Sequence, residues 1–205
     1  MHPLMVALGV AAGAAAPQAS SIQAQNPPPA SSAGGTLLPP EPVPAHHPQG
    51  DVRSSVDALL GTRDGAVSPE QWRSLGPSAT PILEEIVEDK AALSSRRGRA
   101  IEGMVALRSP RTEALLEKII PADDEPFLVR VAAMRGVGRM LSTARLVALL
   151  KPPLAKATDV HIRAAAAEVL SRHRAGCAAV RAQSRREPAD TQVAFEPALR
   201  RCGAK

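Results

Sequence analysis

Aromatic residues are almost absent from this chain of 205 residues, which contains two Phe, one Trp and no Tyr. A core without aromatic rings has to be built from Ala, Leu, Val, Ile and Met. Such side chains suit closely stacked helices better than a sheet, which favours β-branched and aromatic residues. Runs that alternate apolar and polar residues in the manner of a strand are also absent. The composition therefore predicts an all-α protein.

Signatures of catalysis and of metal binding are missing as well. The sequence has no G-x-S-x-G, H-E-x-x-H, P-loop, Gly-rich dinucleotide turn or C-x-x-C motif. The adjacent pair His46-His47 has no further ligand at a useful spacing, so we interpret it as part of a linker. We predict no catalytic residue, no cofactor and no metal ion.

The first 16 residues are an apolar run without a charged side chain, too short to span a bilayer comfortably. Small residues follow, and the pattern predicts a secretory signal over residues 1–24, which makes the protein periplasmic or secreted. Its only positive groups are the terminal amine and His2. A disordered Ala-rich start or a misassigned initiation codon is therefore the alternative. Residues 25–50 are dominated by Pro, Gly and Ser, and predict an extended linker.

After residue 50 the sequence changes to helix-forming Ala, Leu and Arg, and an internal period of 33 residues appears. It aligns R-G-R-A-I-E-G-M-V-A-L-R from Arg97, R-V-A-A-M-R-G-V-G-R-M-L from Arg130 and R-A-A-A-A-E-V-L-S-R-H-R from Arg163 (130 − 97 = 33; 163 − 130 = 33). A second apolar segment precedes each of these. Each repeat is predicted to be a helical hairpin, and stacking buries the apolar surface that a single hairpin leaves exposed.

Capping signals divide this part of the chain further. Ser68-Pro69-Glu70-Gln71 predicts a helix start with a capping box, whereas Pro121, Pro152 and Pro153 are each predicted to end a helix. We predict N-terminal capping helices over 51–76, with the Trp72 indole packed on the first repeat. The repeats follow over 77–174, and a C-terminal capping hairpin over 175–205.

The repeated pattern of an acidic loop followed by V/I-R-x-A-A-x-x-L/V resembles the HEAT repeats of bacterial proteins. It is seen in D-D-E-P-F-L-V-R-V-A-A-M-R-G-V and in D-V-H-I-R-A-A-A-A-E-V-L. The resemblance covers about residues 77–174 and implies a right-handed α-solenoid of three to four hairpins. The first repeat departs from the pattern, because S-S-R-R-G replaces the usual apolar-Arg-x-Ala.

The resemblance also implies a stacking role for Arg97, Arg130 and Arg163. In HEAT-like stacks this arginine pairs with an acidic residue in the loop before its helix or in the adjoining repeat, where its planar guanidinium can hold a carboxylate by two hydrogen bonds. Asp124 and Asp159 are the carboxylates we expect to serve Arg130 and Arg163. Further carboxylates near these arginines are Asp123, Glu125 and Asp89. Direct binding of a ligand by the three arginines is the alternative.

The remaining arginines of the second helices are expected to line the concave surface. They are Arg96, Arg99, Arg135, Arg139, Arg172 and Arg174. Of these, Arg99, Arg135, Arg139 and Arg172 are the predicted partner-binding residues, since a basic stripe favours an acidic protein segment or an anionic polymer. A solvated helical face is the alternative.

The two cysteines, Cys177 and Cys202, bracket the last predicted hairpin, with helices near 176–186 and 193–201. In an antiparallel hairpin the start of the first helix lies beside the end of the second. We therefore predict a disulfide between them, which an exported protein can keep.

The function that we expect is a non-enzymatic, exported scaffold that holds a protein partner on its concave face. The net charge of +5 allows that partner to be acidic. A HEAT-like chromophore lyase or accessory enzyme is an alternative, since such lyases share chiefly the same repeat. Nucleic-acid binding is a further alternative, which the scarcity of aromatic residues and the predicted export disfavour.

Overall fold

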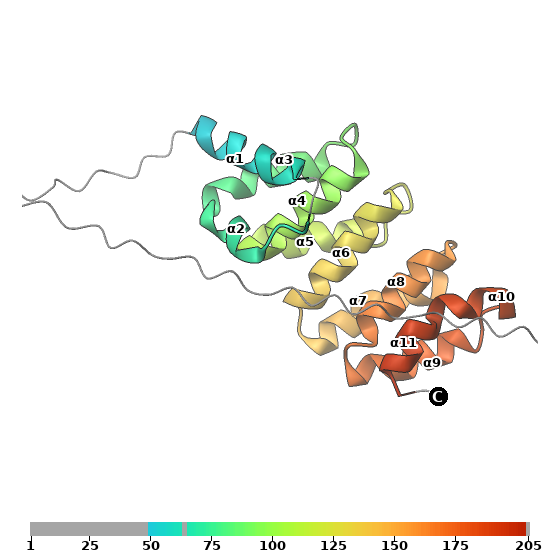
Figure 1. Ribbon diagram of the computed structural model, residues 1–205. Coiled ribbons are helices and arrows are strands. Elements are labelled where there is room, and N and C mark those ends of the chain that lie inside the picture. Colours follow the sequence, from blue (N-terminus) through green and yellow to red (C-terminus); the bar gives the residue numbers. More distant parts are fainter. Residues whose placement is uncertain (1–48, 63–64, 204–205) are drawn as a thin grey trace, which may run out of the picture. The chain divides into compact units, whose positions relative to one another are not determined.

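The computed structural model describes residues 49–62 and 65–203, and these ranges contain helices and turns but no strand (Figure 1). The all-α prediction is therefore confirmed for the described residues. The predicted signal segment over 1–24 and the His46-His47 pair lie outside them. All described residues belong to one compact unit.

Short connections join the helices of this unit. In chain order they are α1 (Gln49–Gly61), α2 (Pro69–Ser74), η1 (Pro77–Ala79), α3 (Thr80–Glu88), α4 (Ser94–Leu107), α5 (Pro110–Ile119), α6 (Phe127–Met140), α7 (Thr143–Lys156), α8 (Val160–Leu170), η2 (Arg174–Gly176), α9 (Cys177–Ser184), α10 (Ala189–Gln192), η3 (Val193–Phe195) and α11 (Glu196–Arg201).

The 33-residue period of the sequence is also the period of the helix starts. Helices α4, α6 and α8 begin at Ser94, Phe127 and Val160 (127 − 94 = 33; 160 − 127 = 33). Each packs against the helix before it, so α3–α4, α5–α6 and α7–α8 are three hairpins. Helix α6 also packs against α4 on one side and α8 on the other. The second helices of the three hairpins therefore form a row, and their buried Ala, Val, Ile and Met side chains form much of the core.

Two helices precede the hairpins, where the sequence predicts capping helices. Ser68 begins α2 with the predicted capping box, because its hydroxyl accepts from the Gln71 amide and Gln71 accepts from the Ser68 amide. Trp72 on α2 is buried against α4, with 1% of its surface exposed. Gly103 permits this approach, since a Cβ at that position would lie 2.9 Å from Cε3 of the indole.

The prediction that Pro152 and Pro153 end a helix is wrong. Both lie inside α7, which continues to Lys156. Two backbone N–H groups are lost from the helix there, but the φ that proline fixes is a helical one, so the chain can continue as at a helix start. Leu154 in the last turn is 2% exposed, and its burial favours the extra turn.

Helices α9 and α11 form the C-terminal end, and the short α10 and η3 lie between them. Helix α11 packs against both α8 and α9. The Sγ atoms of Cys177 and Cys202 are joined in a disulfide, with the two Cα atoms 5.5 Å apart. Gly176 precedes α9 at a close approach to α8: a Cβ there would lie 2.3 Å from the carbonyl oxygen of Leu170.

Candidate functional site

Arg97, the first of the three repeated arginines, connects two successive hairpins. Its Nε donates to the Val87 carbonyl at 2.7 Å, at the end of α3 in its own hairpin. Its NH1 lies 2.8 Å from Oε2 of Glu125, in the loop before α6 of the next hairpin. Both side chains are almost fully buried. Burial raises the pKa of Glu125, but hydrogen bonds from Arg97 and Lys90 outweigh it and hold that pKa below its usual value.

Arg163 makes the same kind of connection at the C-terminal end. Its NH1 donates to the carbonyls of Ala157 and Thr158, just after α7. Its Nε and NH2 each donate at 2.6 Å to one oxygen of Glu187, in the loop after α9. The hydrogen bonds from Arg163 lower the pKa of Glu187 despite its burial, and the same contact raises the pKa of Arg163.

Arg130 differs from the other two. Its Nε donates to the Ile120 carbonyl at the end of α5, as Arg97 does to the end of α3. Its carboxylate partner is Asp123 at 3.0 Å, which belongs to the same hairpin and has 84% of its side chain exposed. Arg130 therefore ties its own hairpin together and contacts no carboxylate of the next one.

Both carboxylates that we expected to serve these arginines are placed elsewhere. Asp124 contacts Lys90 at 3.4 Å rather than Arg130. Its neighbour Asp123 pairs with Arg130, and its other neighbour Glu125 pairs with Arg97. Asp159 caps α8 by accepting from the His161 amide at 2.8 Å. A carboxylate that accepts from the first turn of its own helix points along that helix, so it makes no hydrogen bond to Arg163.

Two of the arginines expected on the concave surface make contacts within the protein, and one of them, Arg99, is a predicted partner-binding residue. Arg99 donates to the carbonyls of Leu60 and Thr62 at the end of α1. Arg96 pairs with Asp57 on α1. Both contacts follow from the packing of α1 on α4, which occupies the face of α4 where these arginines lie. Arg99 therefore caps the C-terminal end of α1, where the helix dipole favours a positive charge.

Arg135 and Arg172, also predicted to bind a partner, both form an ion pair with Glu168. Glu168 on α8 accepts from Arg172 at 2.9 Å and lies 3.5 Å from NH2 of Arg135 on α6. Burial raises the pKa of Glu168, but the bonds from Arg172 and Arg135 outweigh it and lower that pKa. About half of each arginine side chain is still exposed, so both remain accessible to a partner.

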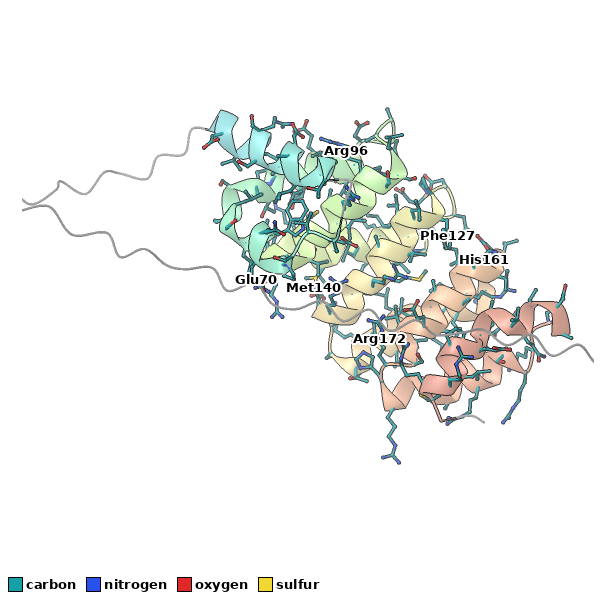
Figure 2. All side chains as sticks on the ribbon, viewed as in Figure 1. Glu70, Arg96, Phe127, Met140, His161 and Arg172 are labelled. Carbon is teal, nitrogen blue, oxygen red and sulfur yellow. A yellow bond between two sulfur atoms is a disulfide. The ribbon has the colours of Figure 1, made fainter. Side chains whose placement is uncertain are left out.

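Beside this cluster lies an apolar groove between α6, α8 and the segment from η3 to α11. We call it the α6–α8 groove; its cavity measures about 370 Å³. Its apolar lining consists of Phe127, Leu128, Val131, Ala164, Ala165 and Pro197, among others. The Phe127 ring meets the His161 ring edge to face, with centroids 6.2 Å apart (Figure 2).

Phe127 and Leu128 are the residues of the groove that sequence reasoning missed. They are 42% and 50% exposed at the start of α6, whereas the residues that follow them on the core face of that helix are buried. The available signal was the position of Phe127, one of only two Phe in the chain, directly after an acidic loop. An apolar pair before the repeated arginine can be either core or surface, so the pattern alone did not decide.

Arginines surround a second hollow next to the disulfide, here called the arginine pocket, of about 380 Å³. It is lined by Arg172, Arg174, Arg181 and Arg201 together with Ser171 and the two cysteines, without a carboxylate. Arg201 also lines the α6–α8 groove, so the two hollows adjoin. Figure 2 shows Arg172 near the end of α8. The apolar groove therefore adjoins a positively charged surface at Arg201.

Neither a metal site nor a membrane span is found in the part of the chain that the structure describes. No three His, Cys, Asp or Glu side chains of residues 49–62 and 65–203 come together in a way that could hold a metal ion. None of the helices in these ranges has the length and apolar character needed to cross a bilayer.

Comparison with protein-family models, with curated proteins and with solved structures finds no match to this chain.

Proposed function

We propose that this chain is an exported, non-enzymatic protein-binding scaffold. In this proposal α3–α4, α5–α6 and α7–α8 are HEAT-like hairpins of a right-handed α-solenoid, and the α6–α8 groove holds a segment of a partner protein. The equal spacing of the helix starts and the row of packed second helices support the stack. The apolar, uncharged start of the sequence and the Cys177–Cys202 bridge support export.

The observation that carries the proposal is the exposure of Phe127 and Leu128 in a hollow. Large apolar side chains that neighbour each other and line a concave surface are typical of interaction sites rather than of ordinary solvated surface. A cavity of about 370 Å³ accommodates a few side chains but not a folded domain. The occupant is therefore an extended or helical peptide segment that inserts apolar residues.

The charge around the groove defines the rest of that segment. The groove itself carries Arg135 and Arg201 against one carboxylate, Glu168, and the arginine pocket adjoins it at Arg201. Since Arg172 and Arg135 already neutralise Glu168, the surface that a ligand meets is positive. The partner segment that complements it has apolar residues next to Asp or Glu side chains.

Selection from a random peptide library displayed on phage, with the full chain as bait, tests this chemistry. We expect enriched peptides that combine Leu, Ile or Phe with neighbouring acidic residues. A synthetic, fluorescein-labelled copy of the enriched sequence then provides an anisotropy assay. In that assay Leu128→Glu weakens binding at least about tenfold, since it places a charge in the apolar lining. Arg201→Glu weakens binding by a smaller factor that shrinks as salt is added.

Leu93→Glu is the matched control, because Leu93 is the most exposed large apolar residue of the described ranges and lies outside the groove. It should leave peptide binding unchanged. Enrichment of basic or purely polar peptides, or equal loss of binding in Leu93→Glu and Leu128→Glu, would contradict the proposal. Self-association of the chain that Leu128→Glu abolishes, measured by sedimentation, would assign the groove to a second copy instead.

A further inference from the structure

A separate cavity of about 310 Å³ lies near the N-terminal end of the described chain, between α2, the C-terminal part of α4 and the end of α6. Its apolar surface comes from Val67, Trp72, Val105 and Ala106. This volume is at the lower end of the range that small-molecule sites occupy, about 300 to 1,000 Å³. The cavity shares no residue with the α6–α8 groove or the arginine pocket.

The charged side chains of this cavity are mostly of one sign. Arg73, Arg108 and Arg139 line it together with a single carboxylate, Glu102, which leaves an excess of two positive charges (3 − 1 = 2). Arg73 pairs with Glu70 outside the cavity. Arg108 and Arg139 are exposed, and no described residue forms an ion pair or hydrogen bond with either guanidinium. Two arginines with free donors beside an apolar floor are suited to hold an anionic group.

The backbone at Arg108 is a second, independent observation. Arg108 follows α4 with φ 54°, and it is the one non-glycine residue of the described ranges with a positive φ. Helices commonly end in this left-handed conformation with Gly, which has no Cβ to strain there. An arginine in a conformation that Gly adopts with less strain points to a role for its side chain. At this position the chain has an arginine side chain at the edge of the cavity, where Gly would have none.

Trp72, one of the lining residues, also carries an unsatisfied donor. Nε1 of Trp72 is buried and has no acceptor among the described residues. Buried donors without a partner are uncommon in folded proteins, and each one calls for an explanation. In this case the donor belongs to a side chain that lines a cavity with room for a ligand.

We propose that this cavity binds a small amphipathic anion, with an apolar ring or short chain on the Val67–Trp72–Val105 surface and a carboxylate between Arg108 and Arg139. The proposal is independent of peptide binding in the α6–α8 groove, since it rests on different residues. The recognition is by charge-assisted hydrogen bonds to the carboxylate and by burial of the apolar part.

Trp72 provides the assay, because it is the only Trp of a chain without Tyr, so all indole emission comes from a residue that lines this cavity. The full chain is titrated with cyclohexanecarboxylate, with neutral cyclohexylmethanol and with cationic cyclohexylmethylammonium. We expect a saturable change in Trp72 emission with the carboxylate, at least about tenfold weaker binding of the alcohol, and no saturation with the amine. Isothermal titration calorimetry measures the same affinities without the indole.

Three variants locate the anion. Arg139→Glu and Arg108→Gly should each weaken binding of the carboxylate about tenfold or more while leaving the alcohol unaffected. Arg108→Gly should also raise the melting temperature, since it relieves the positive φ. Arg111→Glu is the matched control, an arginine on α5 with 84% of its side chain exposed and no part in the cavity.

Equal affinities for the three probes, the absence of saturation with the carboxylate, or unchanged carboxylate binding in Arg139→Glu would overturn the proposal. Unchanged carboxylate binding in Arg108→Gly would overturn the assigned role of Arg108.

Discussion

The two ends of the row of hairpins differ from its middle in how an arginine is used. Arg97 and Arg163 each reach a buried carboxylate of the next pair of helices: Glu125 in the loop between α5 and α6, and Glu187 in the loop after α9. Arg130 sits at the same place of the repeat but reaches only Asp123 of its own hairpin. The step from α6 to α8 is therefore the one that lacks a buried arginine–carboxylate pair across it.

The sequence explains this difference at one position. Glu125 has its equivalent 33 residues later at position 158, where the chain has Thr (125 + 33 = 158). Ion pairs do cross the middle step, from Arg135 to Glu168 and from Arg145 to Glu117, but their side chains are one-third to more than one-half exposed. Such pairs contribute little to stability.

The middle step is also the place where apolar surface is exposed. Phe127 and Leu128 begin α6 beside His161 of α8, and the groove lies along the same boundary. The boundary between α6 and α8 therefore lacks a buried ion pair and also carries the exposed apolar surface that suits a partner. A segment bound there contacts both sides of the step, so binding would also hold α6 and α8 together.

The largest effect is expected from Glu125→Gln. It leaves the buried Arg97 guanidinium without its ionic partner, and loss of one member of a buried pair costs about 3 kcal/mol or more of the free energy of unfolding. Asp123→Asn, the counterpart in the middle hairpin, should cost less, because the Asp123 carboxylate is 84% exposed and water screens its charge, although the Arg130 guanidinium is itself mostly buried. Urea denaturation of the two variants measures both values. Equal losses would remove the distinction between the pairs.

Reduction of the Cys177–Cys202 disulfide, or the double change to Ser, should lower the free energy of unfolding by about 3 kcal/mol. The bridge closes a loop across a sequence separation of 25 residues and ties α9 to the end of α11. Circular dichroism during urea unfolding, with and without reductant, measures the loss. A shift of this size in the reduced protein, and none in the Ser variant on adding reductant, is the expected result. An identical urea midpoint for the unchanged chain and the Ser variant, each with and without reductant, would contradict it.

Acid should destabilise the protein through Glu125 and Glu187. Their folded-state pKa values lie below the ordinary value of 4.5, so the unfolded chain takes up protons first and stability falls as the pH drops through 4.5 and below. Above that pH their contribution is fully present. Glu187→Gln should make the loss of stability between neutral and acid pH smaller than in the unchanged chain. A steeper loss in that variant would show that the sign is wrong.

The smallest expected effect is an increase in the free energy of unfolding. Thr158→Glu places a carboxylate at the position equivalent to Glu125 and should raise the free energy of unfolding by up to about 1 kcal/mol through Arg130. Thr158→Gln is the uncharged control. Thermal melts compare the two variants, and the advantage of Glu over Gln should disappear in an Arg130→Lys background, which lacks the guanidinium. No difference between Glu and Gln at this position would mean that the 33-residue symmetry does not extend to side-chain contacts.

Much of the fold could be predicted from the sequence because the signals for it are local. The recurrence of Arg97, Arg130 and Arg163 predicts three equivalent helices, and α4, α6 and α8 begin at the corresponding spacing. Caps such as the Ser68 capping box depend on neighbouring residues only. The prediction for Pro152 and Pro153 is wrong because burial of Leu154 in the next turn offsets the cost of two prolines in the helix, and this burial is not visible in the local sequence.

The partners of the arginines could not be predicted in the same way. Asp123, Asp124 and Glu125 are consecutive, and the direction in which each leaves the loop decides which cation it meets. Arg99 contacts α1, a helix outside the repeat, so no period in the sequence indicates that contact. The site depends on tertiary packing of this kind.

Native-state hydrogen exchange of the full chain tests the central comparison most directly. Because the step from α6 to α8 lacks a buried pair, amides of α7 to α11 should exchange through one cooperative opening at a lower free energy than that of α3 to α6. Addition of the selected peptide should slow exchange of α6 and α8 on both sides of that step. A single opening free energy for all helices, or a boundary between α4 and α6, would contradict the account.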